Sequence, residues 1–277
     1  MYITFDMEGC SGIASRMQTV LNQDAPTAYP RGQRFATDDV KAAIEGILEV
    51  DPEAEIMFND AHNNSMNVFF EEFPENVSAV VDSAETGDEM MGFDDSFDAL
   101  IAVGAHGNVL TADAVLCHIW DARAVKFNDK SLTETCLDAA LAGYYNVPLV
   151  AISGDEVSVK FIRRNISEKV AGAVVKKGIG RYSAVCKNPK ITRRLIRDAA
   201  IEGLKKRKEI PPLTFKNPVT VDIEYNDQFH GYANKFFMPN DERISATEIR
   251  FVAENAKDAY FGFFTRNKLG SQTFQYK

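Results

Sequence analysis

The stretch MYITFDMEG, residues 1–9, decides the fold because it combines a buried strand with two acids at its end. Its first five residues form a largely apolar run that is continuous rather than alternating, which is typical of a strand covered on both faces. Asp6 and Glu8 follow directly and lie two residues apart. In an extended segment both side chains then point to the same side. The sequence therefore predicts a buried strand that presents two carboxylates at its carboxyl end.

Similar apolar runs recur along the first two thirds of the chain. Hydrophobic runs at 54–58, 98–104 and 147–153 are separated from one another by segments that include apolar residues at helical spacing, as at 37–50 and 132–145. Alternation of continuous apolar runs with amphipathic helices favours parallel strand pairing. We expect an α/β fold, with a mostly parallel sheet flanked by helices.

The pattern changes after about residue 187. Residues 189–210 form a basic amphipathic helical segment, residues 218–226 alternate like a half-exposed strand, and residues 253–270 indicate a last helix that ends at Gly270. We therefore predict an α/β metal-binding catalytic domain over 1–190 and a smaller α+β portion over 191–277 packed on it.

Composition excludes several classes of protein. A formal net charge of -9 argues against a nucleic-acid surface, which depends on Lys and Arg. No apolar run approaches the ~18–20 residues that cross a bilayer, and the first residues do not resemble a signal peptide, so we expect a cytoplasmic protein. The cysteines are widely scattered and are interpreted as free thiols: Cys10, Cys117, Cys136 and Cys186.

Acids, amides and histidines follow successive predicted strands. After the run at 1–5 come two acids, after 54–58 an acid and a histidine, and after 98–104 a histidine: Asp6, Glu8, Asn59, Asp60, His62 and His106. Ligands collect at the carboxyl ends of parallel strands. Two carboxylates so close repel each other unless a cation binds both.

Simpler explanations exist for each residue alone. A single acid after a strand often caps the next helix, and a single histidine is often structural. Convergence of carboxylate and imidazole without thiolate favours zinc, manganese or iron, and a shared carboxylate can bridge two ions. His118 is either a general acid/base or a packed side chain. The adjacent Cys117 is not its partner, because neighbours on a strand point to opposite faces, and His230 is assigned to a surface or interface.

The motifs resemble those of the zinc-dependent D-aminopeptidase family of the dipeptide-transport type. FDMEGCSG is similar to the opening motif of that family, FNDAH to its second motif and GAHG to its third. The similarity continues through VLCHIW, FNDKSLTET and AGYYNVPLVAISGDE, over roughly residues 1–190, and weakly at ANKFFMPN.

The resemblance implies a binuclear metallo-aminopeptidase with two divalent ions, of which zinc is expected. It implies the metal ligands Asp6, Glu8, His62, His106 and Glu134, with Asp6 as the bridge. Glu134 is promoted by the resemblance alone, since an acid in a first helical turn is otherwise explained by the helix dipole. The resemblance also implies a catalytic role for His118, an orienting role for Asp60, and a homo-oligomer that forms a ring, for which a decamer is expected.

The expected activity is hydrolysis of a short peptide or amide with an N-terminal D-amino acid. One alternative is a metal-dependent phosphohydrolase, since a strand followed by D-x-E-G has some similarity to the D-x-D opening of haloacid-dehalogenase-type phosphatases. The other is a non-catalytic metal- or peptide-binding assembly.

Overall fold

The N-terminal stretch forms an inner strand of the main sheet. In the computed structural model, which describes residues 1–63, 65–81 and 89–273, β1 (Tyr2–Phe5) pairs in parallel with β2 (Ile56–Asp60) on one side and with β4 (Leu100–Ala105) on the other. Every residue of β1 is buried. Phe5 lies opposite both Asp60 and Val103, so β1 and β2 end at the same level and β4 continues beyond them to Ala105.

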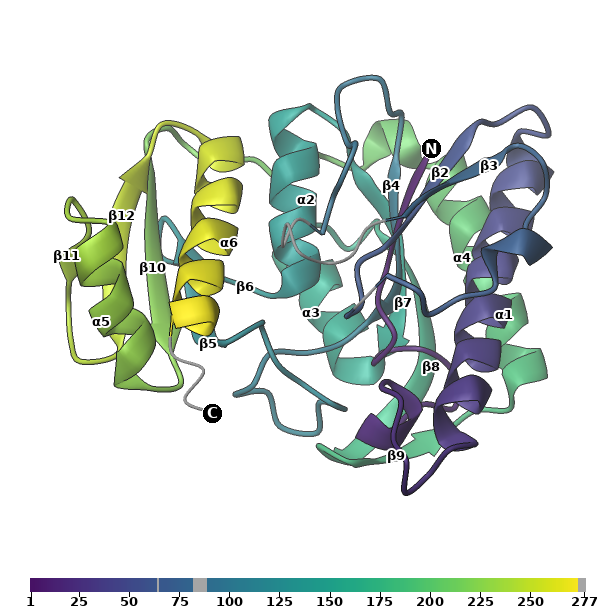
Figure 1. The fold of residues 1–277 in the computed structure, drawn as a ribbon. Coiled ribbons are helices and arrows are strands. Elements are labelled where there is room, and N and C mark those ends of the chain that lie inside the picture. The colour runs from purple at the N-terminus through teal and green to yellow at the C-terminus, as the bar shows by residue number, and fades with distance from the viewer. Residues whose placement is uncertain (64, 82–88, 274–277) are drawn as a thin grey trace.

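The main sheet has the order β3-β2-β1-β4-β7-β8-β9 (Figure 1). Its pairings are parallel except that of β8 with β9. The remaining strands are β3 (Val77–Val80), β7 (Leu149–Asp155), β8 (Ala171–Gly180) and β9 (Ser183–Cys186).

Helices cover both faces of this sheet. The helices α1 (Ala28–Val50) and α4 (Pro189–Lys205) pack together on one face, and α2 (Glu134–Tyr144) and α3 (Glu156–Asn165) lie on the other (Figure 1). The predicted fold class, a mostly parallel sheet flanked by helices, is confirmed. Short 3₁₀ turns occur at Arg16–Gln18, Phe70–Glu72 and Arg207–Glu209.

A second, antiparallel sheet stands beside α2. Its order is β11-β12-β10-β5-β6, and its strands are β5 (Ala122–Phe127), β6 (Lys130–Leu132), β10 (Val219–Tyr225), β11 (Glu242–Arg243) and β12 (Glu248–Ala253). It carries α5 (Gln228–Phe237) and α6 (Ala256–Thr273), and α6 packs against α2 (Figure 1). Because this sheet also includes β5 and β6, the chain enters it twice. The proposed division at residue 190 stays a prediction.

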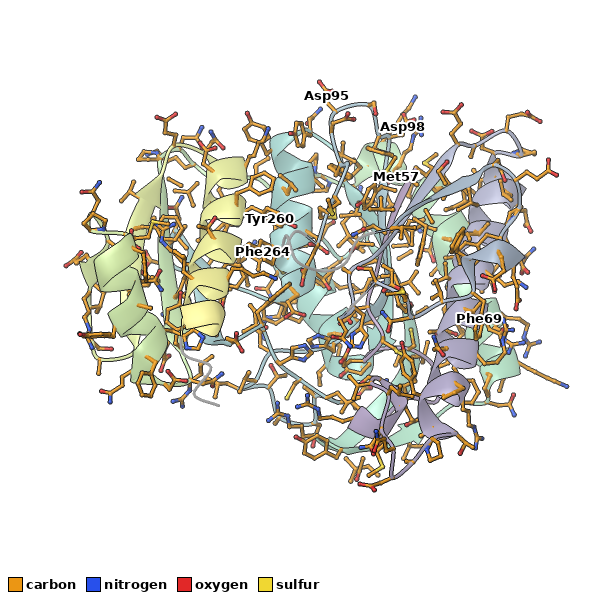
Figure 2. The ribbon with its side chains drawn as sticks, viewed as in Figure 1. Met57, Phe69, Asp95, Asp98, Tyr260 and Phe264 are labelled. Atoms are coloured by element: carbon orange, nitrogen blue, oxygen red, sulfur yellow. The ribbon has the colours of Figure 1, made fainter. Side chains whose placement is uncertain are left out.

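Side chains of α6 connect the second sheet to the site described below. Tyr260 and Phe264, labelled in Figure 2, are buried, and the Phe264 ring packs edge to face on Trp120 with ring centroids 5.3 Å apart. The described helices include none that is both long and apolar enough to span a bilayer.

Two helix boundaries differ from the sequence expectation. The helix predicted from residue 37 begins at Ala28, and the last helix runs past Gly270 to Thr273. Apolar periodicity sets the buried face of a helix but leaves its ends weakly defined, since an isolated glycine in a helix is tolerated at a cost of about 1 kcal/mol.

Candidate metal centre

The ends of three parallel strands bring the predicted ligands together. Asp6 follows β1, His62 follows β2 and His106 follows β4, and the register of the strands places all three at one edge of the sheet. Both histidines are buried. The loop after β1 lies directly against β4, because the Gly9 N–H donates to the Gly104 carbonyl over 2.7 Å. A Cβ at residue 9 would stand 2.1 Å from the Ala105 oxygen, so this approach requires glycine.

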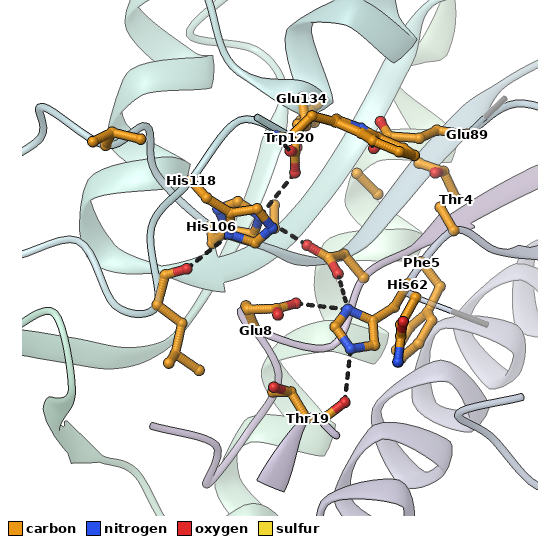
Figure 3. Close-up of a pocket in the computed structure, with 18 of the residues that line it drawn as sticks. Thr4, Phe5, Glu8, Thr19, His62, Glu89, His106, His118, Trp120 and Glu134 are labelled. Atoms are coloured by element: carbon orange, nitrogen blue, oxygen red, sulfur yellow. Dashed lines mark hydrogen bonds and ion pairs between the residues drawn. The ribbon is translucent and has the colours of Figure 1, made fainter. Parts of the chain in front are cut away.

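The first group of candidate ligands is formed by Asp6, Glu8 and His62 (Figure 3). The Nδ1 atom of His62 lies 3.0 Å from Asp6 Oδ1 and 2.9 Å from Glu8 Oε2. Its other ring nitrogen, Nε2, lies 2.9 Å from the Thr19 carbonyl oxygen. This outer contact fixes the ring orientation, so that Nδ1 faces the two carboxylates.

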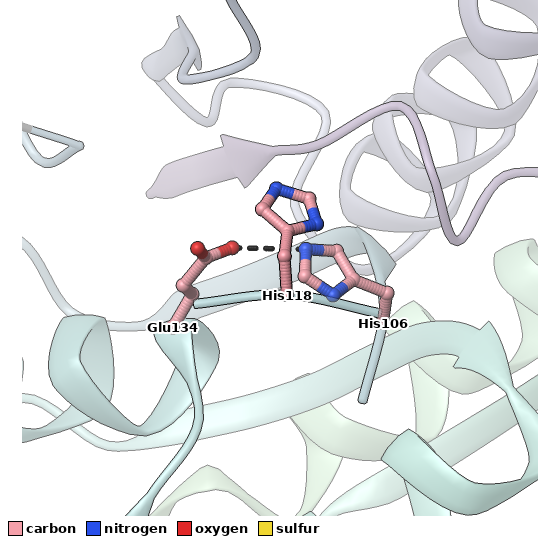
Figure 4. A group of neighbouring side chains, drawn as sticks. All are labelled: His106, His118 and Glu134. Atoms are coloured by element: carbon pink, nitrogen blue, oxygen red, sulfur yellow. Dashed lines mark ion pairs between the residues drawn. The ribbon is translucent and has the colours of Figure 1, made fainter. Parts of the chain in front are cut away.

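The second group of candidate ligands is formed by His106, His118 and Glu134 (Figure 4). His106 Nε2 lies 2.9 Å from Asp6 Oδ2 and 2.9 Å from Glu134 Oε2. Its Nδ1 is 3.0 Å from the Gly107 carbonyl oxygen. The carboxylate of Asp6 therefore stands between the two groups, with one oxygen facing each imidazole.

The arrangement of these atoms fits two divalent cations better than it fits hydrogen bonds. Each inward-facing imidazole nitrogen lies within 3.0 Å of two carboxylate oxygens, yet one N–H can donate well to only one of them. Glu8 Oε2 and His106 Nε2 are buried, and in spite of these short contacts neither makes a well-oriented hydrogen bond within the described residues. Burial of such atoms is unfavourable unless a ligand satisfies them. A carboxylate and imidazole donor set suits zinc.

The pKa values of these groups also indicate that negative charge dominates the site. Burial alone would raise the pKa of Asp6, but the His106 and His62 imidazoles hold it well below its usual range. Burial opposes protonation of both histidines, yet Glu8 raises the pKa of His62 and Glu134 raises that of His106. The protein thus stabilises positive charge at the two positions where a cation would bind.

Glu134 reaches the site from the first residue of α2. The Thr133 side chain caps this helix by accepting from the Cys136 N–H. Glu134 Oε1 accepts a hydrogen bond of 2.7 Å from the Trp120 N–H, which leaves Oε2 directed at His106.

His118 packs on His106 with ring centroids 4.3 Å apart and ring planes 12° apart. Its Nδ1 lies 2.9 Å from the Leu116 carbonyl oxygen. When Nδ1 carries the proton, Nε2 is an acceptor. His118 lines the same pocket as the candidate ligands. Its position is compatible both with metal binding and with proton transfer.

The structure also shows where the other residues considered in the sequence lie. Asp60 accepts from the backbone N–H of His62 over 3.2 Å and from Asn67, so it holds the loop of His62 rather than its imidazole. His230 lies outside this cluster on α5, 3.3 Å from Asp227 and stacked on Tyr225. All four cysteines are free thiols, as predicted.

Sequence reasoning missed two charged residues that support the site. Lys176 is 1% exposed, and its Nζ donates to the backbone oxygens of Glu8, Cys10 and Ile13, which order the loop after β1. Glu89 is 7% exposed and accepts a hydrogen bond from the Trp120 indole N–H. Burial raises the pKa of the Glu89 carboxyl well above its usual range, as do the negative charges of Glu134 and Asp138.

A pocket of about 670 Å³ opens onto both groups of ligands. Figure 3 shows Glu89, Thr4 and Trp120 on one side of the histidines and Glu8 and Thr19 on the other. The volume lies within the range usual for small-molecule sites. The centre therefore combines candidate cation ligands with room for a short substrate.

Comparisons with known proteins agree along nearly the whole chain. A family model described as D-aminopeptidase matches residues 1–264. The D-aminopeptidase of Bacillus subtilis (strain 168) is 26% identical over 277 residues, covering 99% of this chain and 98% of the relative. The solved structure described as "Zn-dependent D-aminopeptidase DppA from Bacillus subtilis, a self-compartmentalizing protease" has a TM-score of 0.89 at 26% identity, and 98% of each chain is covered.

Proposed function

The chain belongs to the D-aminopeptidase family, and we propose that it releases N-terminal D-amino acids from short peptides or amides at a site with two zinc ions. The observation that carries this proposal is the position of Asp6, whose two oxygens each face an imidazole from a different strand. The similar B. subtilis structure is described as zinc-dependent, which supports zinc as the native metal. The resemblance seen in the motifs is confirmed, and neither a phosphohydrolase nor a binding assembly is supported by the comparisons.

We assign Asp6, Glu8 and His62 to one ion and Asp6, His106 and Glu134 to the other. Two divalent ions in such a site polarise a substrate carbonyl and lower the pKa of water. The carbonyl contacts made by His62 Nε2 and His106 Nδ1 hold both rings in place before substrate binds.

His118 moves the proton in this proposal. The bond between Nδ1 and the Leu116 oxygen selects the tautomer in which Nε2 is basic. His118 accepts a proton at Nε2 during attack and donates it to the leaving amine, as a general base and then a general acid. Stacking on His106 keeps the His118 ring beside the centre.

We further propose that the protein is cytoplasmic and assembles as a homo-oligomeric ring, with ten subunits as the expected number. The relative described as self-compartmentalizing supports assembly. Light scattering of the metal-loaded protein tests the subunit number, and a monomeric mass would contradict the ring.

The activity test compares D- and L-alanine amides and dipeptides, with and without chelator, on the zinc-loaded protein. We expect release from the D-substrates that chelator abolishes and zinc restores. Absence of chelator-sensitive release from every substrate would refute the peptidase assignment, and turnover of 4-nitrophenyl phosphate alone would favour the phosphohydrolase.

The proton-transfer role is tested with His118→Ala and with His230→Ala as the matched control. We expect His118→Ala to keep its zinc, measured by elemental analysis, and to lose about 10²–10⁴-fold in kcat. His230→Ala should retain activity, because His230 lies on α5 outside both groups of ligands. Loss of zinc in His118→Ala would instead identify His118 as a ligand.

A further inference from the structure

Glu89 places a buried carboxylate in the pocket beside the metal centre but outside both groups of ligands. Its side chain is 7% exposed. Within the described residues no Lys or Arg forms an ion pair with it. A carboxylate buried in this way is unfavourable unless a partner compensates its charge.

The hydrogen bonds of Glu89 leave one oxygen available. Oε1 accepts from the Trp120 indole N–H, whereas Oε2 has no hydrogen-bond partner among the residues that the structure describes. The same tryptophan donates its backbone N–H to Glu134. One residue therefore holds Glu89 at a fixed position relative to a predicted metal ligand.

The wall around Glu89 contains two further carboxylates. Glu134 and Asp138 lie four residues apart on α2, a spacing that brings like charges together on one helix face. Asp138 accepts from Thr4 over 3.1 Å, and both residues line the pocket. The ions would compensate Glu134 but not Glu89, so the pocket is suited to a cationic group on the substrate.

We propose that Glu89 Oε2 binds the α-ammonium group of the substrate and so makes the enzyme specific for peptides with a free amino terminus. The inference rests on the proposed function. In an aminopeptidase substrate the ammonium is attached to the carbon next to the scissile carbonyl, so its site must adjoin the metal centre. The connection from Glu89 through Trp120 to Glu134 satisfies this requirement.

The test compares two substrates that differ only in the amine: D-alanine 4-nitroanilide and propionyl 4-nitroanilide. The measured quantity is the ratio of their kcat/KM values for the wild type, Glu89→Gln and Glu71→Gln. Glutamine keeps an acceptor for Trp120 and removes the charge. We expect the ratio to fall about 10–100-fold in Glu89→Gln, the effect of losing a hydrogen bond to a charged group. Glu71 is exposed and outside the pocket, so its variant should match the wild type.

The possible outcomes separate this inference from the proposed function. If the zinc-loaded wild type cleaves neither anilide nor any dipeptide, the proposed function fails and the inference fails with it. If the wild type is active and Glu89→Gln keeps the wild-type ratio, only the role of Glu89 is overturned. Equal losses on both substrates together with loss of zinc would also overturn it, by showing that Glu89 supports the metal.

Glu89→Asp keeps the inference testable if the glutamine variant does not fold. This variant retains the charge on a shorter side chain. We expect an intermediate ratio with full zinc content, and a ratio equal to that of the wild type would contradict direct contact with the ammonium.

Discussion

Replacing Lys176 with Met should destabilise the protein and weaken zinc binding, although Lys176 is not a predicted ligand. Its ammonium is buried and donates to three backbone oxygens in the loop between β1 and the first 3₁₀ turn, those of Glu8, Cys10 and Ile13. Because Glu8 belongs to this loop, the lysine fixes the backbone from which one carboxylate reaches the metal centre.

The magnitude follows from the groups left without partners. Each buried carbonyl oxygen that loses its donor costs about 1–3 kcal/mol. Part of this loss is offset because methionine needs no desolvation of an ammonium, so we expect a net loss of about 3–5 kcal/mol. For a chain of 277 residues this lowers Tm by about 5–10 °C. Zinc affinity should fall about 10–100-fold, the usual effect of losing a group that supports a ligand.

The assay is thermal unfolding of zinc-loaded and chelator-treated protein, together with zinc titration against a competing chelator. Lys177→Met is the matched control, since Lys177 is the next residue on β8 and is exposed. The reasoning is refuted if Lys176→Met and Lys177→Met have the same Tm and the same zinc affinity.

Four further substitutions test the site and its surroundings. Asp6→Ala should lower affinity for both ions by more than about 100-fold, whereas Glu8→Ala should affect one ion; elemental analysis after dialysis that finds two ions in Asp6→Ala contradicts the bridge. Burial raises the pKa of Asp39 to about 6. Protonation of Asp39 therefore contributes its full stabilisation to the folded state below about pH 4, and this contribution is lost as the pH rises through 6. Asp39→Asn should therefore gain about 3 kcal/mol in free energy of unfolding relative to the wild type between pH 4 and 8, and parallel urea-unfolding profiles would exclude this. Gly9→Ala should displace the loop after β1 and lower zinc content, because its Cβ would overlap the Ala105 oxygen; unchanged zinc content would show that the backbone can adjust.

The meeting of the strand-end side chains could be predicted because local patterns and a general rule of sheet geometry suffice for it. A continuous apolar run identifies an inner strand, and parallel pairing brings the residues after each strand to one edge. The positions of Asp6, His62 and His106 follow from these two steps. One Asp6 oxygen lies 3.0 Å from His62 Nδ1, and the other lies 2.9 Å from His106 Nε2. Glu134 does not follow, because an acid at the start of a helix has a sufficient local explanation in the helix dipole.

Glu89 could not be found because its significance depends on contacts distant in sequence. Trp120, which donates to it, is 31 residues away, and no spacing or periodicity links the two. In the sequence Glu89 directly follows another acid, Asp88, and such a pair of acids indicates neither burial nor a partner. Only the folded chain shows that this carboxylate enters the pocket with one oxygen open.

Lys176 could not be predicted because the side chains of β8 switch between the buried and the exposed face of the sheet partway along the strand. Alternation buries Ala171, Ala173 and Val175, and continuing it would bury Lys177 and expose Lys176. The pairing with β7 shifts between Gly154 and Asp155, where β8 advances by one extra residue. Such a bulge moves all later side chains to the opposite face. The sequence Lys-Lys gives no sign of this shift, so the inward lysine and its support of the metal loop depend on a register change that only strand pairing reveals.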